Sequence, residues 1–224
     1  MALEVIQLEN QLMKSNCFII VDWDSNSCVI IDPASEKSER EIAYIEEHNL
    51  RLDYILLTHE HADHTWGVNA LKEKYNDAKL VCSELCEKNA KKTSKAYFLL
   101  YYDKKGYRYE LLPADVIIHT DEDTIKWNNF DIHFVMTPGH SFGSMCIDVG
   151  GMLFTGDTIM PFEPYFNGRD SNEKEWKSSI VRILNTYDMS AMFYPGHGEP
   201  ITLNEWNKQN YINIAKNESN TSCR

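Results

Sequence analysis

Short apolar runs separated by polar turns recur along the whole chain and predict its secondary structure. In the first half, runs rich in Val, Ile and Phe predict strands over residues 4–9, 17–22, 27–32, 53–57 and 79–82. Apolar positions at helical spacing predict helices over residues 36–48 and 66–75. Ser35, just before the first of these helices, is a candidate N-terminal cap.

The second half repeats this arrangement. Apolar runs predict strands near residues 115–118, 124–127, 130–136, 144–149, 152–155 and 191–194. The pair Asn128-Asn129 suits a hairpin turn, and helices are expected at about 173–186 and 204–215. Strands followed by helices in both halves predict two sheets packed face to face with helices outside. We therefore expect one domain over residues 1–216 and a polar, frayed tail over residues 217–224.

Residues 84–112 are the least regular part of the chain. The charged stretch from Glu84 to Lys95 has the character of a helix, and an aromatic run from Tyr97 to Tyr102 follows it. One interpretation is a helix whose aromatic face packs on the sheets. The other is a cap over a cleft or a contact between two copies of the chain. This region is the best candidate for shaping the choice of substrate.

The densest candidate chemistry lies directly after the apolar run 54–57. The stretch Thr58-His59-Glu60-His61-Ala62-Asp63-His64 contains three histidines and an interleaved aspartate. A lone histidine is more often a structural or surface residue than a ligand, but such a cluster is far harder to explain by chance. Imidazole and carboxylate are usual ligands of zinc and similar divalent ions. Asp63 and His64 are adjacent and can point away from the other two histidines, which suits two ions better than one.

Three later segments each place one metal-capable residue in a glycine-containing turn after a short apolar run. Glycine permits tight turns and close backbone approach. The segments are Thr137-Pro138-Gly139-His140-Ser141, Thr155-Gly156-Asp157-Thr158 and Tyr194-Pro195-Gly196-His197-Gly198. A repeated layout of strand followed by ligand is how the edge of a sheet builds a metal site.

Together, these candidate ligands resemble the metal-binding motif of the metallo-β-lactamase superfamily in their order and spacing. The set consists of His59, His61, Asp63, His64, His140, Asp157 and His197. The resemblance spans roughly residues 15–203 and implies an α/β (α+β) fold, a four-layer αββα sandwich. Within the superfamily, the chain looks most like the glyoxalase II group, the hydroxyacylglutathione hydrolases. It departs from that group at Glu60, and it stops at Arg224 without the basic C-terminal segment with which full-length members grip glutathione. A generic thioester hydrolase is therefore expected.

The resemblance implies a site for two divalent metal ions, with zinc expected and iron or manganese as alternatives. The family's pattern assigns the ligands of the first ion as His59, His61 and His140, and those of the second as Asp63, His64 and His197. Asp157 would bridge both ions. Thr58 and Asp32 are candidates for orienting the ligating imidazoles. Asp32 could equally be a turn residue at the entry to the first helix.

Such a centre implies hydrolysis. A metal lowers the pKa of bound water to about 7, so a hydroxide that bridges two ions can attack a carbonyl or a phosphorus. Asp63 would orient this nucleophile and accept its proton, or act as a ligand only. The expected reaction is cleavage of a thioester, ester or lactone. Substrate contacts are expected from Tyr165, Phe166 and Arg169, although Arg169 could instead pair with Asp170 or another acid.

Two other functional classes stay open. An iron-dependent redox enzyme such as a persulfide dioxygenase would use only His59, His140 and Asp157. A phosphodiesterase or nuclease is the second alternative. The formal net charge of −12 disfavours a nucleic-acid surface, because nucleic-acid binders usually carry a basic patch. A small-molecule substrate is therefore the expected partner, and a homo-oligomer stays open.

The expected compartment follows from features that the sequence lacks. Residues 1–7 include an early acid and no long apolar core, unlike a signal peptide, and no apolar run of roughly 18 residues predicts a membrane span. The six cysteines show no disulfide-framework spacing, and Cys82 and Cys86 are interpreted as structural rather than as zinc ligands. These features predict a cytoplasmic protein with reduced cysteines and no membrane partner.

Overall fold

Two six-stranded sheets organise the chain in the computed structural model, which describes residues 3–11, 13–90, 109–162, 164, 166, 169–188 and 190–202. The first sheet has the order β1-β2-β3-β4-β5-β6. Its strands are β1 Leu3–Glu9, β2 Asn16–Asp22, β3 Ser27–Ile31, β4 Arg51–Leu56, β5 Lys79–Ser83 and β6 Val116–Ile118. The first three strands pair antiparallel, and β3 to β6 pair parallel. The carboxyl end of β4 therefore lies at the same edge as those of its parallel neighbours.

The second sheet has the order β12-β11-β10-β9-β8-β7. Its strands are β7 Glu122–Trp127, β8 Phe130–Met136, β9 Met145–Val149, β10 Met152–Gly156, β11 Met192–Pro195 and β12 Ile201–Thr202. Pairing is antiparallel except between β10 and β11. Because β9 runs opposite to both of its neighbours, β8, β10 and β11 all end at one edge of this sheet.

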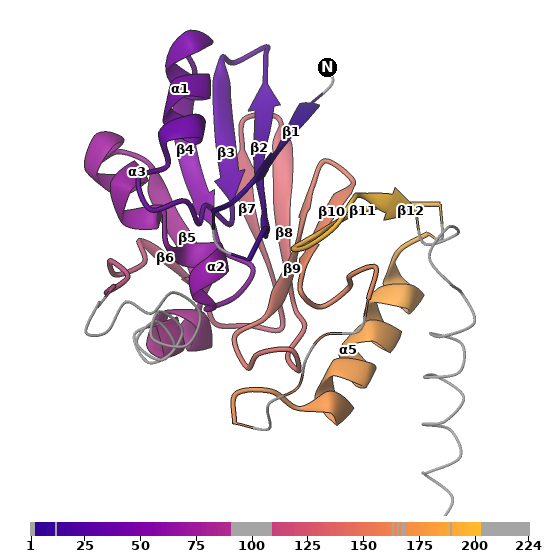
Figure 1. Cartoon of the computed structure of the whole chain (residues 1–224). Helices are drawn as coiled ribbons and strands as arrows, with labels where there is room; N and C mark the ends of the chain where they lie inside the picture. Colours follow the sequence, from indigo (N-terminus) through magenta and orange to yellow (C-terminus); the bar gives the residue numbers. More distant parts are fainter. Residues whose placement is uncertain are drawn as a thin grey trace, which may run out of the picture.

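Helices cover the outer faces of the two sheets (Figure 1). They are α1 Glu39–Glu47 and α3 Val68–Lys74 on the first sheet and α5 Glu173–Thr186 on the second. The short helix α2 Ala62–Thr65 lies in the loop after β4, and residues 84–90, directly after β5, are also helical. Side chains of α1 and α3 pack with the first sheet, and those of α5 pack with the second. The expected four-layer αββα sandwich is therefore confirmed. No helix within the described ranges is long and apolar enough to cross a membrane.

The alternation of side chains along the strands explains the three layers of core. Strand β2 is buried along its whole length. Phe18 and Ile20 face the second sheet, whereas Ile19 faces the helices on the other side. Between the sheets, the rings of Phe18 and Phe154 lie 5.2 Å apart. A strand that is covered on both faces needs apolar side chains on both, so its sequence is a continuous apolar run, as in residues 17–21 of β2.

Most predicted elements are confirmed, and the differences lie at turns. Helix α1 begins at Glu39, later than predicted, because Ser38 adopts a left-handed conformation with φ of 45°. The predicted cap at Ser35 is wrong, since the N-cap residue is Ser38 and its side chain makes no cap bond. Helix α5 has the predicted bounds and is capped by Asn172. Strand β12 and helix α2 were not predicted, and the predicted helix over 204–215 lies outside the described residues.

Part of the irregular region 84–112 is described. Residues 84–90 are helical, as predicted for the start of this segment, and residues 91–108, with the aromatic run, lie outside the described residues. Tyr109 is buried against the first sheet's outer core, and its hydroxyl donates to the carbonyl of Thr65 at the end of α2. The burial of Tyr109 agrees with the interpretation in which aromatic side chains of this region pack on the sheets.

Candidate metal centre

The loops that follow β4, β8, β10 and β11 meet at one end of the sandwich. His59 follows β4, His140 follows β8, Asp157 follows β10 and His197 follows β11. Backbone hydrogen bonds join the loops of the two sheets, one from Met145 N to Thr58 O at 2.8 Å. All seven residues of the predicted ligand set are therefore brought together, although they come from opposite sheets.

The first predicted group consists of three histidines whose ring nitrogens face one another. His61 Nδ1 lies 3.1 Å from His59 Nε2 and 3.0 Å from His140 Nε2. Two nitrogens bound to one tetrahedral zinc lie about 3.3–3.4 Å apart, given Zn–N bonds of about 2.0–2.1 Å. The three nitrogens are thus spaced as ligands of one ion, and these residues form one of the clusters that could hold a metal.

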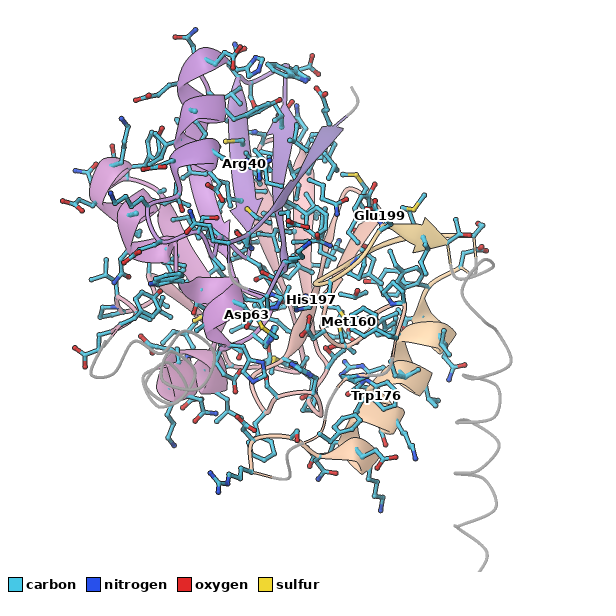
Figure 2. All side chains as sticks on the ribbon, viewed as in Figure 1. Arg40, Asp63, Met160, Trp176, His197 and Glu199 are labelled. Atoms are coloured by element: carbon cyan, nitrogen blue, oxygen red, sulfur yellow. The ribbon has the colours of Figure 1, made fainter. Side chains whose placement is uncertain are left out.

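The second predicted group lies beside the first. His197 Nε2 is 3.4 Å from Asp63 Oδ2, and His64 Nε2 is 3.8 Å from the same oxygen. These three residues form another cluster that could hold a metal, and Figure 2 shows Asp63 and His197 near each other at the end of the sandwich. Asp157 lies between the groups, with Oδ1 3.5 Å from His64 Nε2 and Oδ2 3.4 Å from His140 Nε2.

Asp32 sets the proton positions of two of these histidines. Its Oδ2 accepts from Thr58 Oγ1 at 2.5 Å and from His64 Nδ1 at 2.9 Å. Since the Thr58 hydroxyl donates to the carboxylate, its oxygen accepts from His59 Nδ1 at 3.1 Å. In their neutral forms, both rings then carry the proton on Nδ1 and turn an unprotonated Nε2 toward the site, as metal-binding histidines require. Asp32 therefore orients the imidazoles, one of the two roles predicted for it.

Asp170 lies beside the His61 ring much as Asp32 lies beside the His64 ring, and the sequence did not predict this neighbour. Its Oδ2 lies 3.9 Å from His61 Nε2, the ring atom opposite the one that faces the other histidines. The only signal in the sequence was its position next to Arg169 in the loop after Asp157. Because 169–170 and 59–61 lie far apart along the chain, only the folded structure identifies this neighbour.

The electrostatics differ between the two groups. Burial lowers the pKa of His140 to about 4, although Asp157 opposes this shift, and burial together with His64 holds the pKa of His59 well below its usual value. Burial also disfavours a charge on His64, but Asp157, Asp63 and Asp32 outweigh it and raise the pKa of His64 to about 10. Burial thus favours the neutral forms of His59 and His140, whereas the surrounding carboxylates favour a positive charge beside His64 Nε2, which either a proton or a cation can supply.

The opposing effects of burial and of neighbouring charges also set the pKa values of the other candidate ligands. Burial opposes the charged forms of Asp63 and Asp157, yet the neighbouring His64 keeps the pKa of both carboxyls below the usual range. Burial disfavours a charge on His61 and His197, but the nearby carboxylate of Asp170 raises the pKa of His61, and the carboxylate of Asp157 raises that of His197. The second group therefore favours a positive charge at its centre, which a divalent ion would supply in place of protons.

Buried polar atoms without partners support a metal at this position. His64 Nε2 and Asp157 Oδ1 are buried and make no hydrogen bond, although they lie 3.5 Å apart. Gly196 leaves the space beside them open, since a Cβ at this position would collide with Asp157 Oδ1 and with the His64 ring. Leaving buried polar groups unpaired is costly, so a nitrogen and a carboxylate oxygen that face the same space fit a cation between them.

Of the three residues predicted to contact the substrate, the two that the structure describes do not form a cluster in the way that the candidate metal ligands do. Tyr165 lies outside the described residues. Phe166 packs against Trp176 of α5, with ring centroids 5.4 Å apart, and Arg169 is exposed. Phe162, in the same loop, was not singled out in the sequence; it is 55% exposed and its ring lies 6.4 Å from that of His197. An apolar surface therefore borders the site at Phe162.

Cys82 and Cys86 behave as structural residues. Both are buried in the outer core of the first sheet. Neither belongs to a cluster that could hold a metal within the described part of the chain. The two residues therefore fit the structural interpretation.

Comparisons with known proteins agree with this geometry. A family model described as the metallo-β-lactamase superfamily matches residues 11–197. A hydroxyacylglutathione hydrolase of Pelagibacter ubique is 30% identical over 224 aligned residues, which cover 98% of this chain and 79% of the relative. A probable polyketide biosynthesis zinc-dependent hydrolase of Bacillus velezensis, BaeB, is 28% identical over 193 residues, which cover 86% of this chain and 76% of that protein.

Solved structures show the same fold. The crystal structure of BLEG-1 B3 metallo-β-lactamase superposes with a TM-score of 0.80 at 21% identity, and covers 90% of this chain and 95% of its own. The crystal structure of ETHE1 from Myxococcus xanthus gives a TM-score of 0.72 at 23% identity, and covers 96% and 90%. The matched family, the hydrolase relatives and the histidine–aspartate clusters lead to one conclusion. The chain belongs to the metallo-β-lactamase superfamily, resembles its glyoxalase II group, and is a metal-dependent hydrolase.

Proposed function

We propose that this hydrolase cleaves a thioester of a small organic acid at a centre that holds two zinc ions. The observation that carries the proposal is the position of Asp157. Its two carboxylate oxygens lie 3.5 Å from His64 Nε2 and 3.4 Å from His140 Nε2. One residue therefore serves both candidate ligand groups, which is the arrangement that a pair of ions needs.

The ligand assignment follows the two clusters. We propose that His59, His61 and His140 hold one ion, that Asp63, His64 and His197 hold the other, and that Asp157 bridges them. Two divalent ions held there would supply a water activated near neutral pH and a positive charge that faces the carbonyl oxygen of the substrate. Zinc is favoured because histidine nitrogen and carboxylate oxygen suit it, with iron or manganese as alternatives.

The protein's own residues would orient the metal ligands and accept a proton from the attacking water. Asp32 and Thr58 hold His59 and His64 in the tautomer that ligation needs. We assign Asp63 as the residue that orients the attacking water and accepts its proton, because its carboxylate lies within the second ligand group, with Oδ2 3.4 Å from His197 Nε2 and 3.8 Å from His64 Nε2. Proton transfer by a positioned side chain typically contributes about 10²–10⁴-fold to a rate.

A thioester is favoured as substrate by the relatives. One is named a hydroxyacylglutathione hydrolase and another a zinc-dependent hydrolase of polyketide biosynthesis. Esters and lactones share the electrophilic carbonyl and stay within the proposal. The carrier that bears the acyl group, the cytoplasmic location and the oligomeric state stay predictions.

A panel of substrates tests the proposal with protein of measured metal content. The panel contains a hydroxyacyl thioester of glutathione, a coenzyme A thioester, an aryl ester, a lactone and a phosphodiester. We expect thioester hydrolysis that falls about 100-fold or more in His197→Ala, because several kcal/mol of charge stabilisation depend on the ions. His133→Ala is the matched control, since His133 is exposed on β8 and contacts Thr124 instead of the site.

Two results would overturn the proposal. One is hydrolysis of the phosphodiester with no cleavage of any thioester, ester or lactone. The other is oxygen uptake by iron-loaded protein without hydrolysis of any substrate in the panel. The first would assign a phosphodiesterase and the second a redox enzyme.

A further inference from the structure

Glu60 stands between two predicted metal ligands, and its carboxylate is bound by other segments of the chain. Its side chain is fully buried, with 0% exposure. Oε2 accepts from Ser141 Oγ at 2.8 Å, and Oε1 accepts from Asn89 Nδ2 at 3.3 Å. Ser141 directly follows His140, and Asn89 lies on the helical segment 84–90. One buried carboxylate therefore joins the turn of His59 and His61 to two other parts of the site.

The direction of the hydroxyl groups depends on this carboxylate. A carboxylate only accepts, so the single hydroxyl proton of Ser141 must point to Glu60. Ser144 Oγ, 2.8 Å from Ser141 Oγ, must then donate to Ser141, and it accepts in turn from the Ser141 backbone N–H at 3.2 Å. The conformation of the loop just after His140 is thus held by a chain of hydrogen bonds that ends at Glu60.

The loop after His140 also fits tightly against Glu60. A Cβ at Gly143 would collide with Glu60 Oε2 and with the backbone of Cys86, so only glycine allows this approach. The carbonyl of Gly143 accepts from Ser83 Oγ at 2.7 Å, and the same hydroxyl oxygen accepts from Cys86 N at 3.1 Å. The loop is therefore held between Glu60 and the start of the 84–90 helix.

A buried charge at this position needs an explanation beyond filling space. Taking an ionised carboxylate out of water is unfavourable unless hydrogen bonds and nearby positive charge compensate it. An apolar side chain would fill the same volume without that cost. The contacts of Glu60 with Ser141 and Asn89 are specific, and they converge on the loop that carries a predicted ligand.

We propose that Glu60 is a positioning residue that acts through Ser141 and holds the His140 loop against the turn of His59 and His61. In this way it preforms the first ligand group before an ion binds. Through Asn89 it also ties the helix 84–90 to the same group. The inference rests on the proposed function, because the group that Glu60 preforms is the proposed site of the first ion.

Zinc titration calorimetry tests this role without any activity assay. The variant His197→Ala keeps the first ligand group complete, and His140→Ala keeps the second. On the His197→Ala background, we expect Glu60→Gln and Ser141→Ala each to weaken zinc binding about 10–100-fold, the usual effect of contacts that orient metal ligands. The double variant should lose little more than the larger single loss, because both residues act through one contact. On the His140→Ala background, neither change should alter zinc affinity more than about twofold.

A control separates positioning from general stability. Asp53 also accepts a bond inside the fold, from Trp127 Nε1 at 2.9 Å, but it lies on β4 away from the ligand loop. Asp53→Asn should lower the stability of the metal-free protein in urea and leave zinc affinity unchanged. Asn89→Ala provides a second variant of the same contact network should Ser141→Ala fail to fold.

The possible failures are distinguishable. Unchanged zinc affinity in Glu60→Gln, Ser141→Ala and Asn89→Ala would overturn the positioning role. Equal losses on both backgrounds would also overturn it, because they would show a general loss of structure. Absence of zinc binding by the unmodified protein would instead refute the proposed function, and the inference with it.

Discussion

Asparagine in place of Asp32 provides a stringent test of how the site is held. The carboxylate accepts three hydrogen bonds, from Thr58 N at 2.8 Å, Thr58 Oγ1 at 2.5 Å and His64 Nδ1 at 2.9 Å. An amide of the same shape has one acceptor oxygen and one NH2 group. Whichever way it turns, the NH2 group must face a donor that the carboxylate used to accept.

The two orientations of the amide in Asp32→Asn have defined consequences. With its NH2 group toward His64 and the Thr58 hydroxyl, it would force His64, and through Thr58 also His59, to move the proton to Nε2. With the NH2 group toward the Thr58 backbone, a buried N–H loses its acceptor. A buried donor left unpaired costs about 1–3 kcal/mol, which corresponds to about 5- to 150-fold in a binding constant. We therefore expect zinc affinity to fall about 10–100-fold, as for other contacts that orient metal ligands.

Calorimetric titration of the metal-free protein with zinc measures this loss. The control is Asp22→Asn, because Asp22 is also buried and accepts from Ser25 Oγ at 2.6 Å and Asn128 Nδ2 at 2.9 Å, away from the site. It should affect stability in urea but not zinc affinity. If Asp32→Asn bound zinc as tightly as the unmodified protein, the argument from tautomers would be refuted.

Four further predictions concern the same centre and the core. Asp157→Ala should retain at most one tightly bound ion by elemental analysis, and retention of two would contradict the bridging role. Gly196→Ala should also reduce metal content, because its Cβ would collide with Asp157 Oδ1 and His64, whereas Gly151→Ala, with nothing within 4 Å, should not. In the metal-free protein the pKa of His64 is raised from 6.5 to about 10. Its stabilising contribution should therefore be complete below about pH 6.5 and be lost as the pH rises through about 10. Urea unfolding across this range should show the loss, and His64→Gln should remove it. Phe134→Ala, fully buried between the sheets, should lower the free energy of unfolding by about 3–5 kcal/mol, and a loss below about 1 kcal/mol in urea would show that this part of the core is loosely packed.

Local patterns were sufficient for most of the secondary structure. Strands such as β2 and β10 are short apolar runs between turns, and α5 carries its own start signal at Asn172, whose side chain accepts from the N–H groups of Lys174 and Glu175. The start of α1 was mispredicted because the left-handed backbone of Ser38 has no such local signal. Ser38 Oγ donates instead to the carbonyl of Gly67 at 3.2 Å, a contact between distant segments.

The sequence by itself identified the candidate metal ligands of this protein, because each metal-capable residue follows an apolar strand within a few positions and its type can be read directly. Only the tertiary structure decided which of them meet and what holds them. The register of two sheets places the ends of β4, β8, β10 and β11 together. Asp170 beside His61 and Ser141 beside Glu60 are equally products of that packing. Such contacts join residues far apart in the chain, and their geometry depends on the packing of the whole fold, which no local pattern encodes.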